Sequence, residues 1–392
     1  MKLGIALLIL AYGFSQFYRA FLAVMAPALE QSVGAGPDDL AFASGIWFLT
    51  FAASQLLVGA ALDRIGPRLT TVSIFGLGAA GGALLFSQAT NPSHINWAMA
   101  LMGFGCSPIL MAGYYIFAKM YPPAAFATLA GLMLGLGSLG NLASAAPTAW
   151  AITTFGWRET MFGLAILTAL MAVVLWFAVQ DPKTEPTREA GSILDLLKIR
   201  ALWPLYALVF VNYAPAAGLR GLWTGPYVQD VFGADVTMIG QVTLAMGVAM
   251  ILGNFACGRF ERLFRSRKWV VFGGTGAATF ALWALVIFTD VGIVTSTLLL
   301  VVIGFGGSFF PLLVAHGRAF MPAHLTGRGI SLINLFGIGG VSLAQFATAP
   351  LHRYGQDIST SATTPYALIF ALLGITSLCG LAAYLRVQDR LD

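Results

Sequence analysis

Long apolar runs separated by short polar breaks dominate this chain. Each run is long enough to cross a hydrocarbon core of about 30 Å as an α-helix, which takes about 20 residues. The alternating segments of about ten residues that mark a membrane β-barrel do not occur. The pattern predicts an all-α membrane protein with twelve transmembrane helices, at residues 4–31, 40–62, 69–90, 95–119, 125–151, 159–180, 202–230, 236–258, 269–289, 294–320, 326–350 and 364–386.

The composition excludes the soluble classes. Of 392 residues, 58% are hydrophobic and 9% are charged, and the mean hydropathy is +0.82. Soluble domains are about 45–50% apolar and about 25% charged, so this chain cannot be a soluble globular, disordered or coiled-coil protein. Cys106, Cys257 and Cys379 lie inside apolar runs, as packing residues do, and indicate neither disulfides nor a metal site. The N-terminal run is interpreted as the first helix and not as a removed signal peptide.

The positive charges orient the helices. With the N-terminus in the cytoplasm, Arg158 and Arg353 fall outside and Arg19 and Arg220 fall within spans, while the remaining Lys and Arg lie at cytoplasmic ends or loops. This bias is typical of the positive-inside rule. It predicts a multi-pass protein of the cell (inner) membrane with both termini in the cytoplasm. The net charge of +5 then reflects retained cytoplasmic cations and not a nucleic-acid partner.

The two halves of the chain repeat each other at a nearly constant offset. GFGCS at 103–107 matches GFGGS at 304–308, and Gly140 matches Gly340. Parallel repeats of this kind place a binding site near the midplane between the halves; the alternative is chance similarity between glycine-rich helices. A polar stretch separates the repeats, so we predict a six-helix half at 1–180, a cytoplasmic linker at 181–200 and a second six-helix half at 201–392.

The loop between the second and third runs carries the clearest motif, GAALDRIGPR. It resembles the signature loop of the major facilitator superfamily, G-x-x-x-D-R-x-G-x-R, through Gly59, Asp63, Arg64, Gly66 and Arg68. The matching loop of the second half, GRFERLFRSRK, is a degenerate copy that keeps Glu261 and Arg262. The resemblance covers the whole chain and implies the major facilitator fold, two pseudo-symmetric six-helix halves that alternate access to a midplane site. It implies gating by these loop residues; the alternative is a charged turn that only fixes topology.

Two arginines lie within spans, where ionisable groups are rare and usually functional. The repeat aligns Arg19 with Arg220 to within about two residues. Two cations facing one cavity repel unless an anion lies between them, and the planar guanidinium suits a carboxylate, nitrate or phosphate. The alternatives are that each arginine snorkels to the outer surface or pairs with a helix end.

The first span, with TyrArgAlaPheLeu at 18–22, is similar to the anion:cation symporter branch of the same superfamily. That branch has an arginine in its first span and moves sugar acids and other organic anions. Tyr18 stands where the branch often has an acid, and no carboxylate lies deep in another span, so the coupling ion is left open. Further cavity-lining candidates, each of which could instead make an interhelical hydrogen bond, are Tyr18, Tyr114, Tyr115 and Asn141.

His316 is the one histidine that the predicted spans contain. Histidine changes charge between pH 5 and 8, so His316 could bind substrate or a coupling proton; a packing role is the alternative. Nucleophile–base sets, HExxH, Walker and GxGxxG motifs do not occur, so neither an enzyme nor an ATP-driven pump is predicted, and no cofactor or metal.

These observations predict a monomeric secondary transporter in the lipid bilayer. Its predicted partners are a small anion substrate, an organic carboxylate above all, and a coupling proton or ion. Movement of the anion together with that ion would be symport. Two other classes stay open. One is an efflux carrier for hydrophobic compounds, which would rely on aromatic walls. The other is a non-transporting membrane receptor or assembly factor that reuses the fold.

The predicted topology can be tested with a tag. A tag fused after Asp392 is expected to resist protease added outside intact spheroplasts, because the cation bias places both termini inside. A tag inserted after Asn91, in a predicted outer loop, serves as the accessible control. Cleavage of both tags would contradict the topology.

Overall fold

The computed structural model describes residues 2–121, 123–182, 193–322 and 326–391, and within these ranges the chain is helical, without a β-strand. Apolar side chains fill the helices, and their backbone groups are hydrogen-bonded within the helices, as hydrocarbon requires. Helices occupy the first six predicted spans as α1 (Lys2–Tyr18), α2 (Leu22–Val33), α3 (Pro37–Arg64), α4 (Pro67–Ile74), η1 (Phe75–Ala80), α5 (Gly81–Ser87), α6 (Pro92–Cys106), α7 (Pro108–Met120), α8 (Pro123–Gly137), α9 (Leu139–Ala143), α10 (Ala146–Phe155) and α11 (Trp157–Ala178).

A short helix in the predicted linker precedes the second series. The elements are α12 (Ile193–Leu197), η2 (Arg200–Leu202), α13 (Trp203–Gly218), η3 (Leu219–Trp223), α14 (Thr224–Phe232), α15 (Val236–Phe264), α16 (Arg267–Ile287), α17 (Ile293–Gly307), α18 (Phe310–Arg318), α19 (Thr326–Ile358) and α20 (Thr363–Tyr384). Of these elements, η1 and η3 are π-helical and η2 is a 3₁₀ turn.

Ten helical stretches in the described ranges are long and apolar enough to cross a membrane, and the bent pair α1–α2 makes an eleventh. α3, with 28 residues, fills the remaining predicted span, 40–62. The predicted all-α fold is therefore confirmed.

The predicted eleventh span, 326–350, is too short. α19 continues past Pro350 to Ile358, and the membrane-capable stretch runs over Gly329–Ile358. His352 consequently lies inside a span, so the prediction that only His316 does so is wrong. The side chain of His352 is 1% exposed, because its ring packs against aromatic side chains of other helices.

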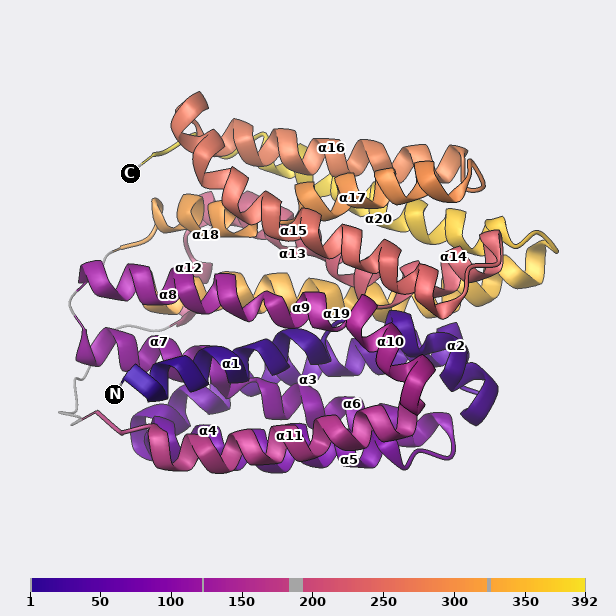
Figure 1. Ribbon diagram of the computed structural model, residues 1–392. Helices are drawn as coiled ribbons and strands as arrows, with labels where there is room; N and C mark the ends of the chain where they lie inside the picture. The colour runs from indigo at the N-terminus through magenta and orange to yellow at the C-terminus, as the bar shows by residue number, and fades with distance from the viewer. Residues whose placement is uncertain (1, 122, 183–192, 323–325, 392) are drawn as a thin grey trace. The chain divides into compact units, whose positions relative to one another are not determined.

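The chain forms two compact units. The first contains Met1–Pro186 with Val236–Gln241, and the second contains Thr187–Asp235 with Val242–Asp392. In each unit the helices run side by side along their length (Figure 1). The pairings correspond between the units: α1 packs on α8, α9 and α11, and α13 packs on α19 and α20, while α5 packs on α6 and α11, and α16 on α17 and α20.

The first glycine of each repeated motif allows one close helix contact. A Cβ atom added to Gly103 of α6 would collide with the Trp47 carbonyl oxygen of α3. A Cβ atom added to Gly304 of α17 would lie 2.9 Å from the Met246 carbonyl oxygen of α15. Small residues at such contacts let helix backbones approach within a membrane.

The second glycine of each motif allows another close contact. A Cβ atom on Gly105 would collide with the backbone of Ala79 in η1, and one on Gly306 would collide with the Gly274 carbonyl oxygen of α16. GFGCS and GFGGS therefore each hold one helix against two neighbours, and the neighbours correspond between the units.

Candidate functional site

Arg19 lies in the break between α1 and α2, where the two helices bend by 51°. Its guanidinium carbon lies 5.4 Å from the ring centroid of Trp47 and 5.4 Å from that of Phe51, both on α3. Its Nε and Nη2 donate long hydrogen bonds to the carbonyl and hydroxyl oxygens of Ser15, at 3.4 and 3.5 Å. Arginine has five N–H donors, and in the described ranges no carboxylate forms an ion pair with Arg19.

Arg220 lies in η3, between α13 and α14, and is 2% exposed. In a π-helix the backbone hydrogen bonds join residues i and i+5, and such turns occur frequently at functional sites. Because the side chain is buried, the snorkelling interpretation is not favoured for Arg220. A buried cation is costly unless negative charge or hydrogen bonds compensate it.

α19 holds both ends of η3. The indole N–H of Trp223 donates to Gln345 Oε1 and Thr348 Oγ1, each at 3.0 Å. Gln345 Nε2 in turn donates to the Gly218 carbonyl oxygen at 3.4 Å. Gln345 therefore contacts Gly218, before Arg220 in the chain, and Trp223, after it. These contacts let α19 fix the backbone that carries the guanidinium.

Arg19 belongs to the first unit and Arg220 to the second, so their joint action remains a prediction. Tyr18 is fully buried, and its hydroxyl contacts Thr168 Oγ1 of α11 at 2.8 Å. This contact favours the interhelical hydrogen bond for Tyr18 over a role in substrate binding. The other candidates of the first unit are half-buried on α7 and α9, namely Tyr114, Tyr115 and Asn141.

The signature loop of the first half contacts Asp181, the first residue of the predicted linker. Asp181 Oδ1 accepts a hydrogen bond from the backbone N–H of Arg68 at 2.8 Å, at the N-terminus of α4, where a negative charge is favourable. The Arg68 guanidinium lies 4.2 Å from the ring centroid of Trp176 on α11. Gly66 has φ +97° and ψ 157°, and a Cβ atom there would lie 2.8 Å from Asp181 Oδ1.

The remaining residues of this loop, Gly59, Arg64 and Asp63, do not share one environment. Gly59 does not mark a close helix approach, since an added Cβ atom would meet only the tip of Met111 at 4.0 Å. Arg64 is exposed. The side chain of Asp63 lies outside the described part of the chain, so its gating role stays a prediction.

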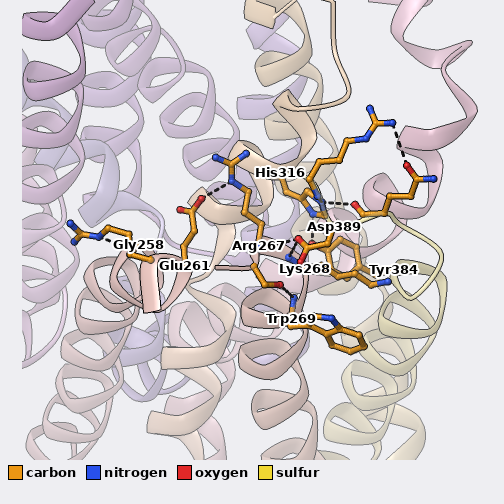
Figure 2. Close-up of polar contacts among 12 residues, drawn as sticks. Gly258, Glu261, Arg267, Lys268, Trp269, His316, Tyr384 and Asp389 are labelled. Carbon is orange, nitrogen blue, oxygen red and sulfur yellow. Dashed lines mark hydrogen bonds and ion pairs between the residues drawn. The ribbon is translucent and has the colours of Figure 1, made fainter. Parts of the chain in front are cut away.

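The loop of the second half contains an ion pair within itself. Glu261 Oε1 lies 2.7 Å from Arg267 Nε, and Arg262 Nε donates to the Gly258 carbonyl oxygen at 3.3 Å. Figure 2 shows Glu261 facing Arg267 across the turn between α15 and α16. Gating by Glu261 and Arg262 remains a prediction.

Asp389, which follows α20, the last helix of the second half, caps α16. Its Oδ1 accepts the backbone N–H groups of Arg267 and Lys268 at 3.1 and 3.0 Å (Figure 2). Lys268 Nζ donates to the Leu385 carbonyl oxygen at 2.7 Å. Asp389 thus does in the second half what Asp181 does in the first. Neither acid was predicted as a site residue from the sequence, although each follows the last helix of its half.

His316 binds the same C-terminal segment. Its Nδ1 lies 2.6 Å from the Tyr384 hydroxyl and its Nε2 lies 2.9 Å from the Gln388 carbonyl oxygen. Both ring nitrogens are engaged and the ring is buried, which favours the packing role. Binding of substrate or a proton by His316 remains untested.

Comparison with known proteins agrees with this architecture. The model of the Major Facilitator Superfamily matches residues 8–345, and the chain belongs to this superfamily. The predicted membership is therefore confirmed. The chain is a multi-pass membrane transporter and not an enzyme, as the sequence predicted.

Curated relatives and solved structures extend this result. The proton-coupled antiporter flippase LtaA of Staphylococcus saprophyticus is 24% identical over 82% of this chain and 78% of its own length. The probable nitrate/nitrite antiporter NarK1 of Thermus thermophilus is 24% identical over 93% and 88%. The cis,cis-muconate transport protein of Acinetobacter baylyi is 24% identical over 58% of each chain. A D-xylose–proton symporter structure shares the fold, with a TM-score of 0.79 at 14% identity over 98% of this chain and 97% of its own.

Gly66→Ala is expected to destabilise the first half. The φ and ψ angles at Gly66 lie in a region that only glycine adopts readily, with a strain of about 1–3 kcal/mol for other residues, and the new Cβ atom would displace Asp181. The midpoint of thermal unfolding in detergent should fall. Gly163→Ala is the matched control, since no atom lies within 4 Å of a Cβ atom there. An equal midpoint for both variants would contradict the role of Gly66.

Asp389→Ala is expected to lower stability in a pH-dependent manner. Burial raises the pKa of the Asp389 carboxyl, but hydrogen bonds from Ser266 and the backbone N–H groups of Lys268 and Arg267 outweigh it, so the pKa lies below its usual range. The contribution is complete above the usual carboxyl pKa of about 4 and disappears as the pH falls through the lowered value.

A lost helix cap costs about 0.5–2 kcal/mol. The thermal midpoint of Asp389→Ala should therefore lie below that of the wild type at pH 7, and the gap should close below about pH 4. Asp357→Ala, which removes an exposed acid on α19, controls for net charge. A gap that is independent of pH would contradict capping by the charged carboxylate.

Proposed function

We propose that this transporter moves a small organic anion across the inner membrane by alternating access, with Arg19 and Arg220 as its anion-binding residues and both termini in the cytoplasm. The observation that carries the proposal is the environment of Arg19. The guanidinium lies beside two aromatic rings, its protein hydrogen bonds are long, and its remaining N–H donors suit a planar acceptor.

The aromatic rings make Arg19 a suitable binding group. Contact with Trp47 and Phe51 stabilises the cation through cation–π attraction without using its N–H donors. The fork of the guanidinium is therefore available for a bidentate contact with a carboxylate or nitrate. The break between α1 and α2 also leaves backbone groups outside the regular helix, as substrate sites in transporters often do.

Arg220 favours an anion because it is buried. At 2% exposure, the guanidinium has lost its bulk hydration, and an anion in contact with it offsets part of that cost. The repeat relates the span of Arg220 to that of Arg19, and sites between parallel repeats lie near the midplane. Several relatives are named for anions: nitrate and nitrite, cis,cis-muconate and hexuronate, which supports this substrate class.

The same proposal assigns the remaining candidates. Tyr114, Tyr115 and Asn141 line the substrate path, and the loop residues Asp63, Arg64, Glu261 and Arg262 control its opening. A proton is the proposed coupling ion and the monomer the proposed functional state. The two units are predicted to be separated by the linker at 181–200.

A second candidate function is efflux of hydrophobic compounds. One cavity favours it, with a volume of about 380 Å³ in the second unit. Its lining is almost entirely apolar and comes from α13, α19 and α20, with Trp203, Tyr206, Phe210 and Phe336 among the lining residues. An apolar solute would occupy such a cavity without any contact to an arginine.

Arg19→Lys and Arg220→Lys separate these functions. Lysine keeps the charge but lacks the planar fork, and a lost charge-assisted hydrogen bond costs about 1.5–3 kcal/mol. Affinity for the anion should therefore fall about tenfold to a hundredfold, and further in the alanine variants. The measurement is calorimetric titration of purified protein with nitrate, cis,cis-muconate and glucuronate.

Arg158→Lys is the matched control, because Arg158 binds the carbonyl oxygens of Ser87 and Ala89 and lies outside the proposed site. Wild-type affinity in both lysine variants would rule out the anion clamp. Absence of binding for all three anions, with saturable binding of an apolar dye, would favour efflux of hydrophobic compounds.

A further inference from the structure

Three aromatic side chains from three elements meet beside η3 in the second unit. Trp223 of η3, His352 of α19 and Tyr366 of α20 are each 1% exposed. The ring centroids of Trp223 and His352 are 5.0 Å apart, and those of His352 and Tyr366 are 5.3 Å apart. We call these three residues the His352 cluster. Neither the anion site nor the loop gates account for this buried histidine.

The His352 cluster is connected to an exposed carboxylate. The Tyr366 hydroxyl donates a short hydrogen bond to Asp230 Oδ2, and Asp230 is exposed at the end of α14. The Tyr366 ring also packs against Tyr227 of α14, with a centroid distance of 5.5 Å. The negative charge of Asp230 therefore lies one tyrosine away from the His352 ring.

The His352 cluster is also connected to Arg220. Trp223 follows Arg220 in η3, and its indole N–H is fixed on α19 by Gln345 and Thr348. Gln345 lies two helical turns before His352 on the same helix. The segment that carries Arg220 and the His352 ring are thus connected through Trp223 and α19.

We propose that His352 is a proton-binding site of the second half and that its protonation is coupled to anion binding at Arg220. Histidine is the side chain that gains or loses a charge between pH 5 and 8. The rings of Trp223 and Tyr366 stabilise an imidazolium through cation–π attraction. The coupling rests on the function proposed above, whereas the proton site itself does not.

The signs of the surrounding charges give the direction of the coupling. Arg220 repels a second positive charge in the same unit, whereas Asp230 attracts it. Arg353 and Asp357, on the same helix as His352, are both exposed, so solvent and salt screen them. A bound anion neutralises Arg220, which favours the proton on His352, and by reciprocity the proton favours the anion. The protein would then carry anion and proton together.

The test measures anion affinity against pH. For the probe anion that binds best among nitrate, cis,cis-muconate and glucuronate, wild-type affinity should fall by up to about tenfold from pH 6 to pH 8. His352→Gln and His352→Phe should show a flat profile, and the second variant retains an aromatic ring if the first fails to fold. His94→Gln is the control, because His94 lies at the start of α6 and contacts Thr90 and Asn91. A wild-type pH profile in both His352 variants would overturn the coupling.

A second measurement separates this proposal from the anion proposal. In wild-type protein with isotope-labelled histidine, the imidazole resonance that disappears in His352→Gln should titrate between pH 5 and 8, with no anion present. If none of the probe anions binds but this resonance titrates, the anion function fails and the proton site stands. A resonance that does not move between pH 5 and 8 overturns the proton site whether or not an anion binds.

Discussion

Hydrocarbon offers no hydrogen-bond partner to a peptide group, and this constraint governs every level of the structure. It requires the chain to cross the membrane as helices, and it removes the hydrophobic force that would otherwise hold those helices together. Close backbone contact at glycine replaces that force. Gly103 and Gly105 in one unit, and Gly304 and Gly306 in the other, are the positions where a single added carbon would push helices apart. The most visible sequence repeat is thus the one that packing makes necessary.

The same medium explains why the polar groups gather in a few places. Arg19 has aromatic neighbours and long hydrogen bonds, and Arg220 is buried in a π-helical turn held by α19. The remaining charges concentrate where the helices end, at Asp181, Glu261, Arg267 and Asp389. The two arginines proposed to bind the anion are therefore distinct from the charges at the helix ends.

Features that depend on neighbouring residues could be predicted from the sequence. Apolar run length identified the helices, and the loop motif identified the turn at Gly66. The residues that the sequence did not reveal depend on contacts between distant parts of the chain. Asp181 and Asp389 lie in polar segments without periodicity. Their capping role becomes visible only in the structure, where each lies beside the N-terminus of another helix. His352 lies just beyond the predicted eleventh span, 326–350, and its burial comes from contacts with Trp223 and Tyr366 on other elements.

The two capping acids bear on how such a protein arose. Asp181 and Asp389 each stand beyond the last helix of a half, yet each completes the N-terminus of a helix within that half. If the halves descend from one duplicated ancestor, the duplicated unit ended past its sixth helix and included a tail that folded back. The start of the linker is then the descendant of that ancestral tail, retained because α4 still depends on it, and only the segment after Asp181 was free to lengthen.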